Sequence, residues 1–432
     1  MIKRFLDTIP VPKEYLCPMD PYLRQLFRKW GEEYVRPNVR KYDEDWLEHK
    51  YVTPAVEKLM VDIGFQRIPF PKKYGGLDLV KSDYMSTVSA MMLEEVCMID
   101  HGIGTYLCGY FWPFVAMLAS PPFYQKELLK EFAPIFCQSE KLITFGVVMT
   151  EPQGGSDIEN IDLVKGKSIR TTAELDGDEW VINGHKLWPT NCGNSGPGTP
   201  GLIDFGAVYC TTKLGSRDPK DVAVIMVPMK QEGVTQGVPY KKAGCSADKN
   251  SDVWFEDVRV PKRYRFWGPG KDFDAVKNMT QYAGFGSGAL AVGAMAKTCE
   301  ILKKYGEERT FAGRPLKEHY GYAGVLGDII SDLIIDRLAV YQCARMSDRP
   351  DIYGDSRSAF ITGSLKAVKN RGVNFAVADL RKAMDILGLC GCDRDKDIEK
   401  IWRDIKISQL WTGGEQLSQI EGMRPFFECE ML

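Results

Sequence analysis

Histidine is scarce in this chain of 432 residues, and its cysteines are not arranged as metal ligands. The four histidines are His49, His101, His185 and His319. They lie too far apart in sequence to form a short metal-binding motif. The twelve cysteines are spread singly except for Cys390 and Cys392, whose spacing fits neither a zinc site nor a redox Cys-x-x-Cys pair. The sequence therefore predicts no metal ion and buried free thiols.

Charge of one sign and long apolar runs are also missing. The 56 basic and 58 acidic residues leave a net charge of −2, which gives no field to attract nucleic acid or anionic lipid. No stretch approaches the roughly 20 apolar residues of a membrane span, and residues 1–5 lack the apolar core of a secretory signal. With 44% hydrophobic and 26% charged residues, the composition is typical of a globular protein of two or three domains. We expect a cytoplasmic protein without a nucleic-acid partner or a membrane span.

A Gly-rich stretch is present between Gly146 and Asn191. Within it, Gly154, Gly155 and Ser156 leave backbone N–H groups uncovered by large side chains. Such a loop suits a phosphate or the polar edge of a flat ring, although the same pattern is typical of a plain surface turn. No Gly-x-Gly-x-x-Gly fingerprint follows a predicted strand and opens a helix, so a nicotinamide dinucleotide site is not indicated.

Strand and turn patterns mark residues 140–265 as a β domain. Asp176-Gly177 and Asn183-Gly184 each predict a tight turn, and they flank a short strand at 180–182. Alternating apolar runs predict further strands at 205–209, 222–227 and 252–255. We expect short antiparallel strands joined by tight turns.

Helical periodicity flanks this β domain on both sides. The predicted helices cover residues 22–35, 53–63, 82–99, 325–344 and 358–387. Prolines before residue 22 predict an extended arm on the surface, and the spacing of Asp328, Asp332 and Asp336 predicts an acidic, solvated helix face. The expected fold class is α+β, with a helical domain and its arm over residues 1–139 and a helical bundle over 266–432.

Longer motifs carry a family resemblance. The segment Thr150-Glu-Pro-Gln-Gly-Gly-Ser-Asp157, followed by residues 176–191, resembles the flavin-binding middle domain of the acyl-CoA dehydrogenase superfamily. Residues 255–261 resemble the family's exit from that domain, residues 308–319 its arginine segment and residues 386–406 its C-terminal flavin segment. Because these motifs occur in the family's order, the resemblance implies an acyl-CoA dehydrogenase-like fold and an acyl-CoA substrate.

The resemblance also implies FAD as the cofactor, with contacts from several segments. Arg309 matches the residue that meets the FAD pyrophosphate across a subunit interface, which implies an oligomer and, as the family norm, a homotetramer. Electrons are expected to leave through an electron-transferring flavoprotein. The other implied FAD contacts are Val147, Met149, Thr150, Gly155, Ser156, Trp188, Thr190 and Gln416.

The family's catalytic glutamate is missing from both of its usual positions. Thr412 stands where this base usually lies, and Ala283 occupies the alternative position on the Gly-rich helix. We expect Asp100 to be the base, in an arrangement that resembles alicyclic acyl-CoA dehydrogenases, with Glu415 as second choice. A plain helix cap is the competing interpretation of Asp100. The expected substrate contacts are Ser156, Asp100 and Gly413.

Several functions remain open from these observations. The preferred one is a dehydrogenase that oxidises a cyclic or branched acyl-CoA. A Gly/Pro loop at residues 194–201 either reshapes its substrate entrance or is a tolerated surface insertion, and the insertion is the favoured interpretation of the loop taken singly. The alternatives are an enoyl-CoA reductase or flavin oxygenase, which needs no strong base, and a catalytically inactive partner subunit of a hetero-oligomer. The retained flavin motifs argue against the inactive subunit, because a chain that no longer binds FAD need not keep them.

Overall fold

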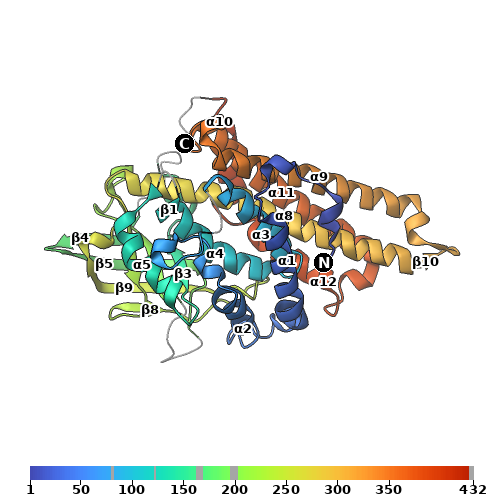
Figure 1. Cartoon of the computed structure of the whole chain (residues 1–432), viewed down its shortest axis with the longest axis horizontal. Helices are drawn as coiled ribbons and strands as arrows, with labels where there is room; N and C mark the ends of the chain where they lie inside the picture. The colour runs from blue at the N-terminus through green and yellow to red at the C-terminus, as the bar shows by residue number, and fades with distance from the viewer. Residues whose placement is uncertain (79–81, 121–122, 162–168, 195–202, 428–432) are drawn as a thin grey trace.

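A computed structural model describes residues 1–432 except 79–81, 121–122, 162–168, 195–202 and 428–432. A β-sheet occupies one end of the molecule, and long helices run from it to the opposite end (Figure 1). The predicted entrance loop at residues 194–201 lies almost entirely outside the described residues.

The N-terminal region is a set of helices around a buried central helix. Its helices are α1 (Asp20–Trp30), α2 (Val52–Glu57), α3 (Met85–Cys97), α4 (His101–Leu118) and α5 (Lys126–Gln138). Every residue of α3 is buried, because this helix packs between α1 and the long C-terminal helices. The predicted surface position of the arm before α1 is wrong for Leu6 and Ile9, which are buried. The guanidinium of Arg337 donates a hydrogen bond to the Leu6 carbonyl at 2.7 Å and ties the arm to the core.

A seven-stranded sheet forms the middle of the chain. Its strands are β3 (Phe145–Val148), β4 (Thr172–Asp176), β5 (Glu179–Thr190), β6 (Phe205–Thr211), β7 (Val222–Pro228), β8 (Val234–Gln236) and β9 (Asn250–Pro261). The order is β3-β6-β4-β5-β9-β8, and β7 pairs with β6. Because β3 runs parallel to β6, the sheet is mixed, whereas the sequence predicted antiparallel strands.

Only one of the two predicted turns in this sheet is a turn. β4 and β5 form an antiparallel hairpin in which Gly177 has a φ of 60°, as the Asp-Gly pair predicts. The turn predicted at Asn183-Gly184 is wrong, because β5 continues through it with a register shift against β9. A Cβ on Gly184 would lie 2.5 Å from Thr171 Oγ1, so glycine is needed here for a close approach of two segments.

The C-terminal region is a bundle of long helices. They are α8 (Lys271–Glu308), α9 (Tyr320–Asp348), α11 (Ala359–Leu387), α12 (Asp397–Ser408) and α13 (Gly414–Met423), with the short α10 (Pro350–Tyr353). The small residues of α8 allow close packing, since a Cβ on Gly293 would lie 2.6 Å from the Glu94 carbonyl of α3. The solvated acidic face predicted on α9 is wrong at Asp336, which is 5% exposed and lies against Gly372 of α11.

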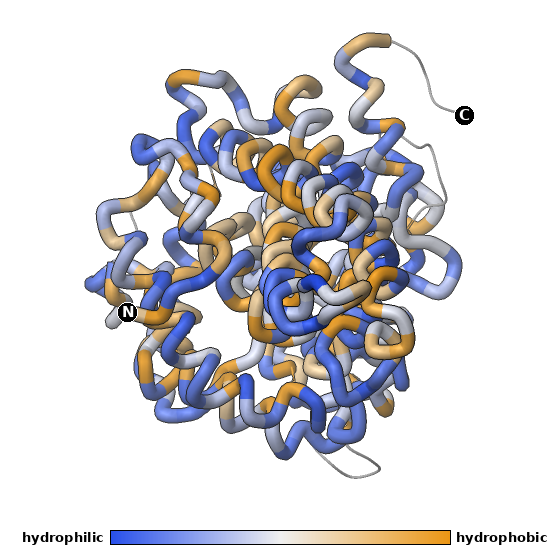
Figure 2. Tube along the Cα trace, turned by 90° about the vertical axis from the view of Figure 1, so that its right-hand side faces the viewer, coloured by the Kyte–Doolittle hydropathy of each residue, from blue (hydrophilic) through white to orange (hydrophobic). Residues whose placement is uncertain are grey.

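Apolar segments gather toward the middle of the molecule when it is viewed along the long helices, and polar segments occupy most of the rim (Figure 2). All described cysteines are free, and all except Cys390 and Cys392 are buried, so the prediction of buried thiols is wrong for this pair. Among the described residues, no group of His, Cys, Asp and Glu side chains is arranged to hold a metal ion. Within the same ranges, no helix combines the length and apolarity needed to cross a membrane. The predicted α+β fold class, with a sheet between two helical regions, is confirmed.

Candidate active site

The loop after β3 is fixed by a buried ion pair. The carboxylate of Glu151 accepts hydrogen bonds from Lys186 Nζ at 2.8 Å and from the Thr171 amide at 2.9 Å. Lys186 lies on β5 and also donates to the Met149 carbonyl at 2.9 Å. Burial raises the pKa of Glu151, but Lys186 and the surrounding amides outweigh this effect and hold the pKa below its usual value. The loop of residues 149–155 is therefore held against β5.

Strand β5 changes direction at Trp188. Its pairing with β9 shifts register between Leu187 and Thr190, and Trp188 has a φ of 62°. A bulky residue in the left-handed region is strained, and bulges of this kind re-aim side chains at functional sites. The Asn250 side-chain amide donates to the Trp188 carbonyl at 3.0 Å. Trp188 as a whole residue is 49% exposed, and its indole packs against the Tyr240 ring, so the bulge carries a large aromatic residue to the surface.

Thr190 fixes the end of β5 on α4. A Cβ added to Gly109 of α4 would lie 2.3 Å from Thr190 Cγ2, so only glycine allows this approach. Next to it, the Asn191 side-chain amide donates to the Tyr106 carbonyl at 3.1 Å, and the Asn191 backbone amide donates to Asp248 at 3.1 Å. Helix and strand therefore hold Thr190 in one place.

These elements bring together the FAD contacts predicted in the middle of the chain. The Thr150 carbonyl accepts a hydrogen bond from the Leu187 amide, which joins the loop to the strand just before the bulge. Ser156 is exposed and begins the short helix α6 (Ser156–Glu159), and Gly155 before it has no side chain to cover its amide. An exposed indole, an uncovered loop amide and an exposed hydroxyl are groups that a flavin ring and its phosphates require, so the residues present fit FAD. The predicted contacts are distributed over β3, the loop, α6 and β5, and they are Val147, Met149, Thr150, Gly155, Ser156, Trp188 and Thr190.

Arg309 is not brought to these residues within one chain. It is exposed, follows the end of α8 and precedes β10 (Thr310–Phe311), at the end of the molecule farthest from the sheet (Figure 1). Because α8 has 38 residues, it is about 57 Å long. Gln416 is also exposed, on the first turn of α13. A contact of Arg309 with the loop of its own chain is excluded by this separation, and a contact across subunits stays the prediction.

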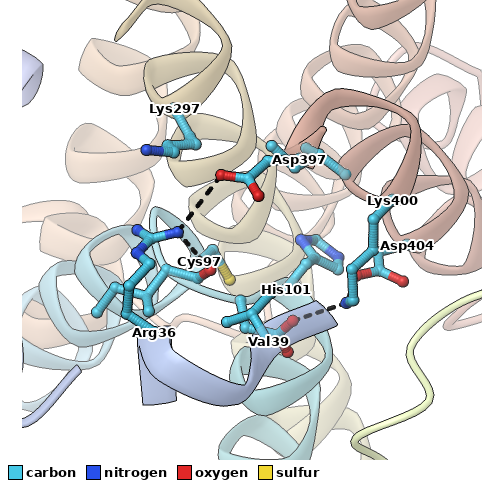
Figure 3. Close-up of a pocket in the computed structure, with 11 residues that line it drawn as sticks. Arg36, Val39, Cys97, His101, Lys297, Asp397, Lys400 and Asp404 are labelled. Atoms are coloured by element: carbon cyan, nitrogen blue, oxygen red, sulfur yellow. Dashed lines mark hydrogen bonds and ion pairs between the residues drawn. The ribbon is translucent and has the colours of Figure 1, made fainter. Parts of the chain in front are cut away.

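Asp100 caps α4 and belongs to a buried ion-pair cluster with Lys400 and Asp404. Figure 3 shows the side chains of Lys400 and Asp404 in this cluster. Its Oδ1 accepts a hydrogen bond from the Ile103 amide at 2.8 Å, and its Oδ2 accepts one from Lys400 Nζ at 2.7 Å. Lys400 also donates to Asp404 Oδ2 at 2.6 Å. Burial raises the pKa of Asp100, although Lys400 opposes the rise. Both oxygens of this carboxylate are therefore engaged, and the capping interpretation is observed directly.

The surroundings of Asp100 differ from those of an acyl pocket. Asp100 precedes Gly109 by nine positions on α4, which is about 13 Å along the helix from the contact with β5. The small cavity beside it is lined by charged side chains that include Arg36, Lys297 and Asp397 (Figure 3). Ligand pockets for apolar groups are lined mainly by apolar side chains. The assignment of Asp100 as base and substrate contact stays a prediction that its surroundings do not support.

The turn before α13 is strained at Thr412, the position that holds the catalytic base in the family that the sequence resembles. Thr412 has a φ of 47°, and its hydroxyl is buried without a partner in the described part of the chain. Gly413 and Gly414 follow with φ values of 76° and 66°. Two buried lysines of α11 hold this turn: Lys366 Nζ donates to the Thr412 carbonyl at 3.4 Å, and Lys369 Nζ donates to the Gly414 carbonyl at 2.8 Å. A β-branched residue at positive φ is a genuine outlier, which is typical of a functional site.

Glu415 and Glu159 are carboxylates near this turn that face different environments. Glu415 is exposed and accepts a hydrogen bond from the Asn374 side-chain amide at 3.2 Å. Glu159, the last residue of α6, was not singled out by the sequence analysis. Burial raises the pKa of its carboxyl to about 7. The sequence shows a glutamate three residues after Ser156. It does not show that this glutamate is buried, because the burial depends on helices that are distant in sequence.

The sequence matches models of three protein-family domains in chain order. They are the acyl-CoA dehydrogenase N-terminal domain over residues 21–120, the middle domain over 146–258 and the C-terminal domain over 273–422. The chain is 26% identical to cyclohexane-1-carbonyl-CoA dehydrogenase of Syntrophus aciditrophicus (strain SB), with 91% of this chain and 92% of that protein covered. It is also 26% identical to the mitochondrial short-chain specific acyl-CoA dehydrogenase of Sus scrofa, with 96% and 90% covered.

Solved structures show the same fold at lower identity. Butyryl-CoA dehydrogenase from Megasphaera elsdenii superposes with a TM-score of 0.79 at 20% identity, over 95% of this chain and 98% of that one. The FAD complex of PigA superposes with a TM-score of 0.79 at 18% identity, again over 95% and 98%. The arrangement of a sheet between two helical regions is therefore shared over nearly the whole length of these proteins.

Proposed function

Because this chain belongs to the acyl-CoA dehydrogenase family of FAD-dependent oxidoreductases, we propose that it oxidises the CoA thioester of a cyclic or branched acid to the enoyl-CoA. The observation that carries this proposal is the bulge at Trp188. It exposes an indole at a strained backbone position beside Thr190 and the loop of residues 149–155. A chain with only a structural role has no need of this strain.

The chain's own residues bind and orient the reactants. When bound, FAD supplies the acceptor for the hydride that leaves the β carbon of the thioester. The exposed plane of Trp188 suits the flavin ring, and the hydroxyls of Thr150 and Thr190 suit its polar edge. We assign contacts with the FAD phosphates to Ser156 and to Arg309 of a second subunit, because a guanidinium fork matches phosphate oxygens.

Two observations support a cyclic or branched acyl group. The relative from Syntrophus aciditrophicus is named for cyclohexane-1-carbonyl-CoA, and it covers 91% of this chain. The positions at which the family usually carries its glutamate are Thr412 and Ala283 here, so a carboxylate on another segment must remove the proton. A base that is held by another segment changes the space around the α carbon, which favours a substrate of different shape.

We also propose that the chain assembles into a homotetramer and passes its electrons to an electron-transferring flavoprotein. Apolar side chains of α9 that are exposed in the single chain, Ile334, Ile335 and Leu338, support an interface between subunits. The separation of Arg309 from the loop of its own chain supports the same conclusion. Light scattering after gel filtration tests the assembly, and the expected mass is four times the chain mass of 48.7 kDa.

The visible spectrum of the purified protein and its bleaching by thioesters test the function. We expect a bound flavin spectrum that is bleached without oxygen by cyclohexanecarbonyl-CoA and isobutanoyl-CoA faster than by butanoyl-CoA and octanoyl-CoA. Equal or faster bleaching by the straight-chain thioesters would contradict the substrate class. Colourless protein that takes up no FAD would contradict the enzyme itself and would favour the inactive partner subunit.

A further inference from the structure

Glu159 lies between the loop of residues 149–155, which we assign to the flavin, and the strained turn before α13. It is the last residue of α6, which continues directly from Gly155. Its carboxylate interacts with the backbone amide of Gly413, the residue after Thr412. One carboxylate oxygen, Oε2, is buried and has no hydrogen-bond partner among the described groups. Leaving a buried carboxylate oxygen without a partner is costly, so its retention points to a function.

We propose that Glu159 is the general base that removes the α proton of the thioester, in place of a glutamate at position 412. This inference rests on the proposed function and deepens it. Because Gly413 follows Thr412 directly, Glu159 brings a carboxylate from α6 to the position that the turn itself leaves without one. Its unpartnered oxygen can accept a proton, whereas both oxygens of Asp100 are already occupied.

Charged side chains from two other helices surround Glu159. Burial has the largest effect and raises its pKa to about 7, Lys366 and Lys369 of α11 lower it, and Glu421 of α13 raises it. Lys366 is ion-paired with Glu421 at 3.0 Å, and Lys369 donates to the Gly414 carbonyl, so both lysines have partners of their own. A base whose pKa lies near neutral pH is suited to accept a proton and to release it again.

The proposed step transfers one proton and removes no electrons from the substrate. The C–H bond at the α carbon breaks, the proton goes to Glu159 Oε2, and the electron pair stays on the substrate as the thioester enolate. When the proton on Oε2 exchanges with solvent and returns, the C–H bond forms again. In heavy water this reversal places deuterium at the α carbon, so the step can be followed apart from flavin reduction.

Deuterium exchange into cyclohexanecarbonyl-CoA, followed by mass spectrometry, tests the proposal. The FAD-loaded wild type is compared with Glu159→Gln, Asp100→Asn and Asp348→Asn. Asp348 is a buried carboxyl that accepts from the Ser86 and Thr87 amides, so it controls for the loss of any buried carboxyl. We expect Glu159→Gln to slow exchange about 100-fold or more at unchanged FAD content, and the other variants to exchange at nearly the wild-type rate.

The outcomes separate this inference from the proposed function. Wild-type exchange in Glu159→Gln, in protein whose flavin is bleached by the thioester, would overturn the role of Glu159 and leave the proposed function standing. Loss of exchange in Asp100→Asn alone would overturn it as well and move the base to Asp100. If the wild type neither exchanges deuterium nor bleaches, the proposed function fails, and this inference fails with it.

The pH dependence of thermal stability reports on the ionisation of the Glu159 carboxyl, and its measurement needs no substrate. Its pKa is raised in the folded protein, so the folded state binds this proton more tightly than the unfolded chain. The resulting stability is present below about pH 4 and is lost as the pH rises toward about 7. Between these pH values Glu159 lowers the Tm of the wild type as the pH rises, and Glu159→Gln should remove this contribution. Identical pH profiles for the two proteins would overturn the buried placement on which the proposal stands.

Discussion

The ammonium group of Lys186 lies 2.8 Å from the carboxylate of Glu151, and the two side chains are 0% and 1% exposed. Through this pair β5, which carries Trp188, is joined to the loop that leads into α6. A buried ion pair contributes little net stability over an apolar pair, but its geometry is enforced, because either charge left alone is costly. The pair therefore fixes the relative position of the segments that we assign to the flavin.

Lys186→Met should be strongly destabilising, because it leaves the Glu151 carboxylate buried without its counter-charge. We expect the free energy of unfolding in urea to fall by about 3 to 5 kcal/mol, with a lower FAD content. The double variant Lys186→Met/Glu151→Leu is the control and should recover much of this loss. A single variant as stable as the wild type would show that the pair does not hold the loop.

Gly109→Ala should disturb the end of β5 through a steric clash. The new Cβ would lie 2.3 Å from Thr190 Cγ2, so one of the two backbones must shift, and we expect a loss of about 1 to 3 kcal/mol together with weaker FAD binding. Thr190→Ser removes the clashing methyl group and keeps the hydroxyl. Thermal unfolding should therefore show partial recovery in the double variant, and no recovery would locate the clash elsewhere.

Arg309→Ala should weaken FAD retention without changing the fold of the chain, because the side chain is exposed and lies far from the loop. The loss of a charge-assisted contact with phosphate predicts a lower ratio of flavin to protein absorbance after gel filtration. Lys317→Ala, another exposed cation of the same region, serves as the matched control and should keep the wild-type ratio. Equal FAD content in all three proteins would contradict the contact across subunits.

Asp100→Asn distinguishes a helix cap from a base. Asparagine caps as well as aspartate, and Lys400 keeps its hydrogen bond to Asp404, so we expect a stability loss of only about 1 to 3 kcal/mol. The rate of flavin reduction by cyclohexanecarbonyl-CoA should stay close to that of the wild type. A rate about 100-fold lower at normal FAD content would instead support Asp100 as the base and argue against Glu159.

The order of helices and strands along the chain could be predicted, because the sequence patterns that mark them are local. The period of apolar residues predicted a helix at 325–344, inside α9, and one at 358–387, which begins one residue before α11 and ends with it. The Asp-Gly pair at Gly177 predicted the hairpin of β4 and β5. The same reasoning failed at Asn183-Gly184. There the glycine serves the approach of Thr171 from another segment, and a turn dipeptide looks identical in both situations.

The sequence by itself determined the α+β architecture, because periodicity is a property of neighbouring residues, and its resemblance to a known family indicated the segments that we assign to the flavin. The tertiary structure alone decided the state of each carboxyl group. Asp100 is paired with Lys400 from 300 positions away, and Glu159 is enclosed by α11 and the turn before α13. Burial and pKa depend on which distant elements pack around a side chain, so one carboxyl group becomes a helix cap and another a proposed base.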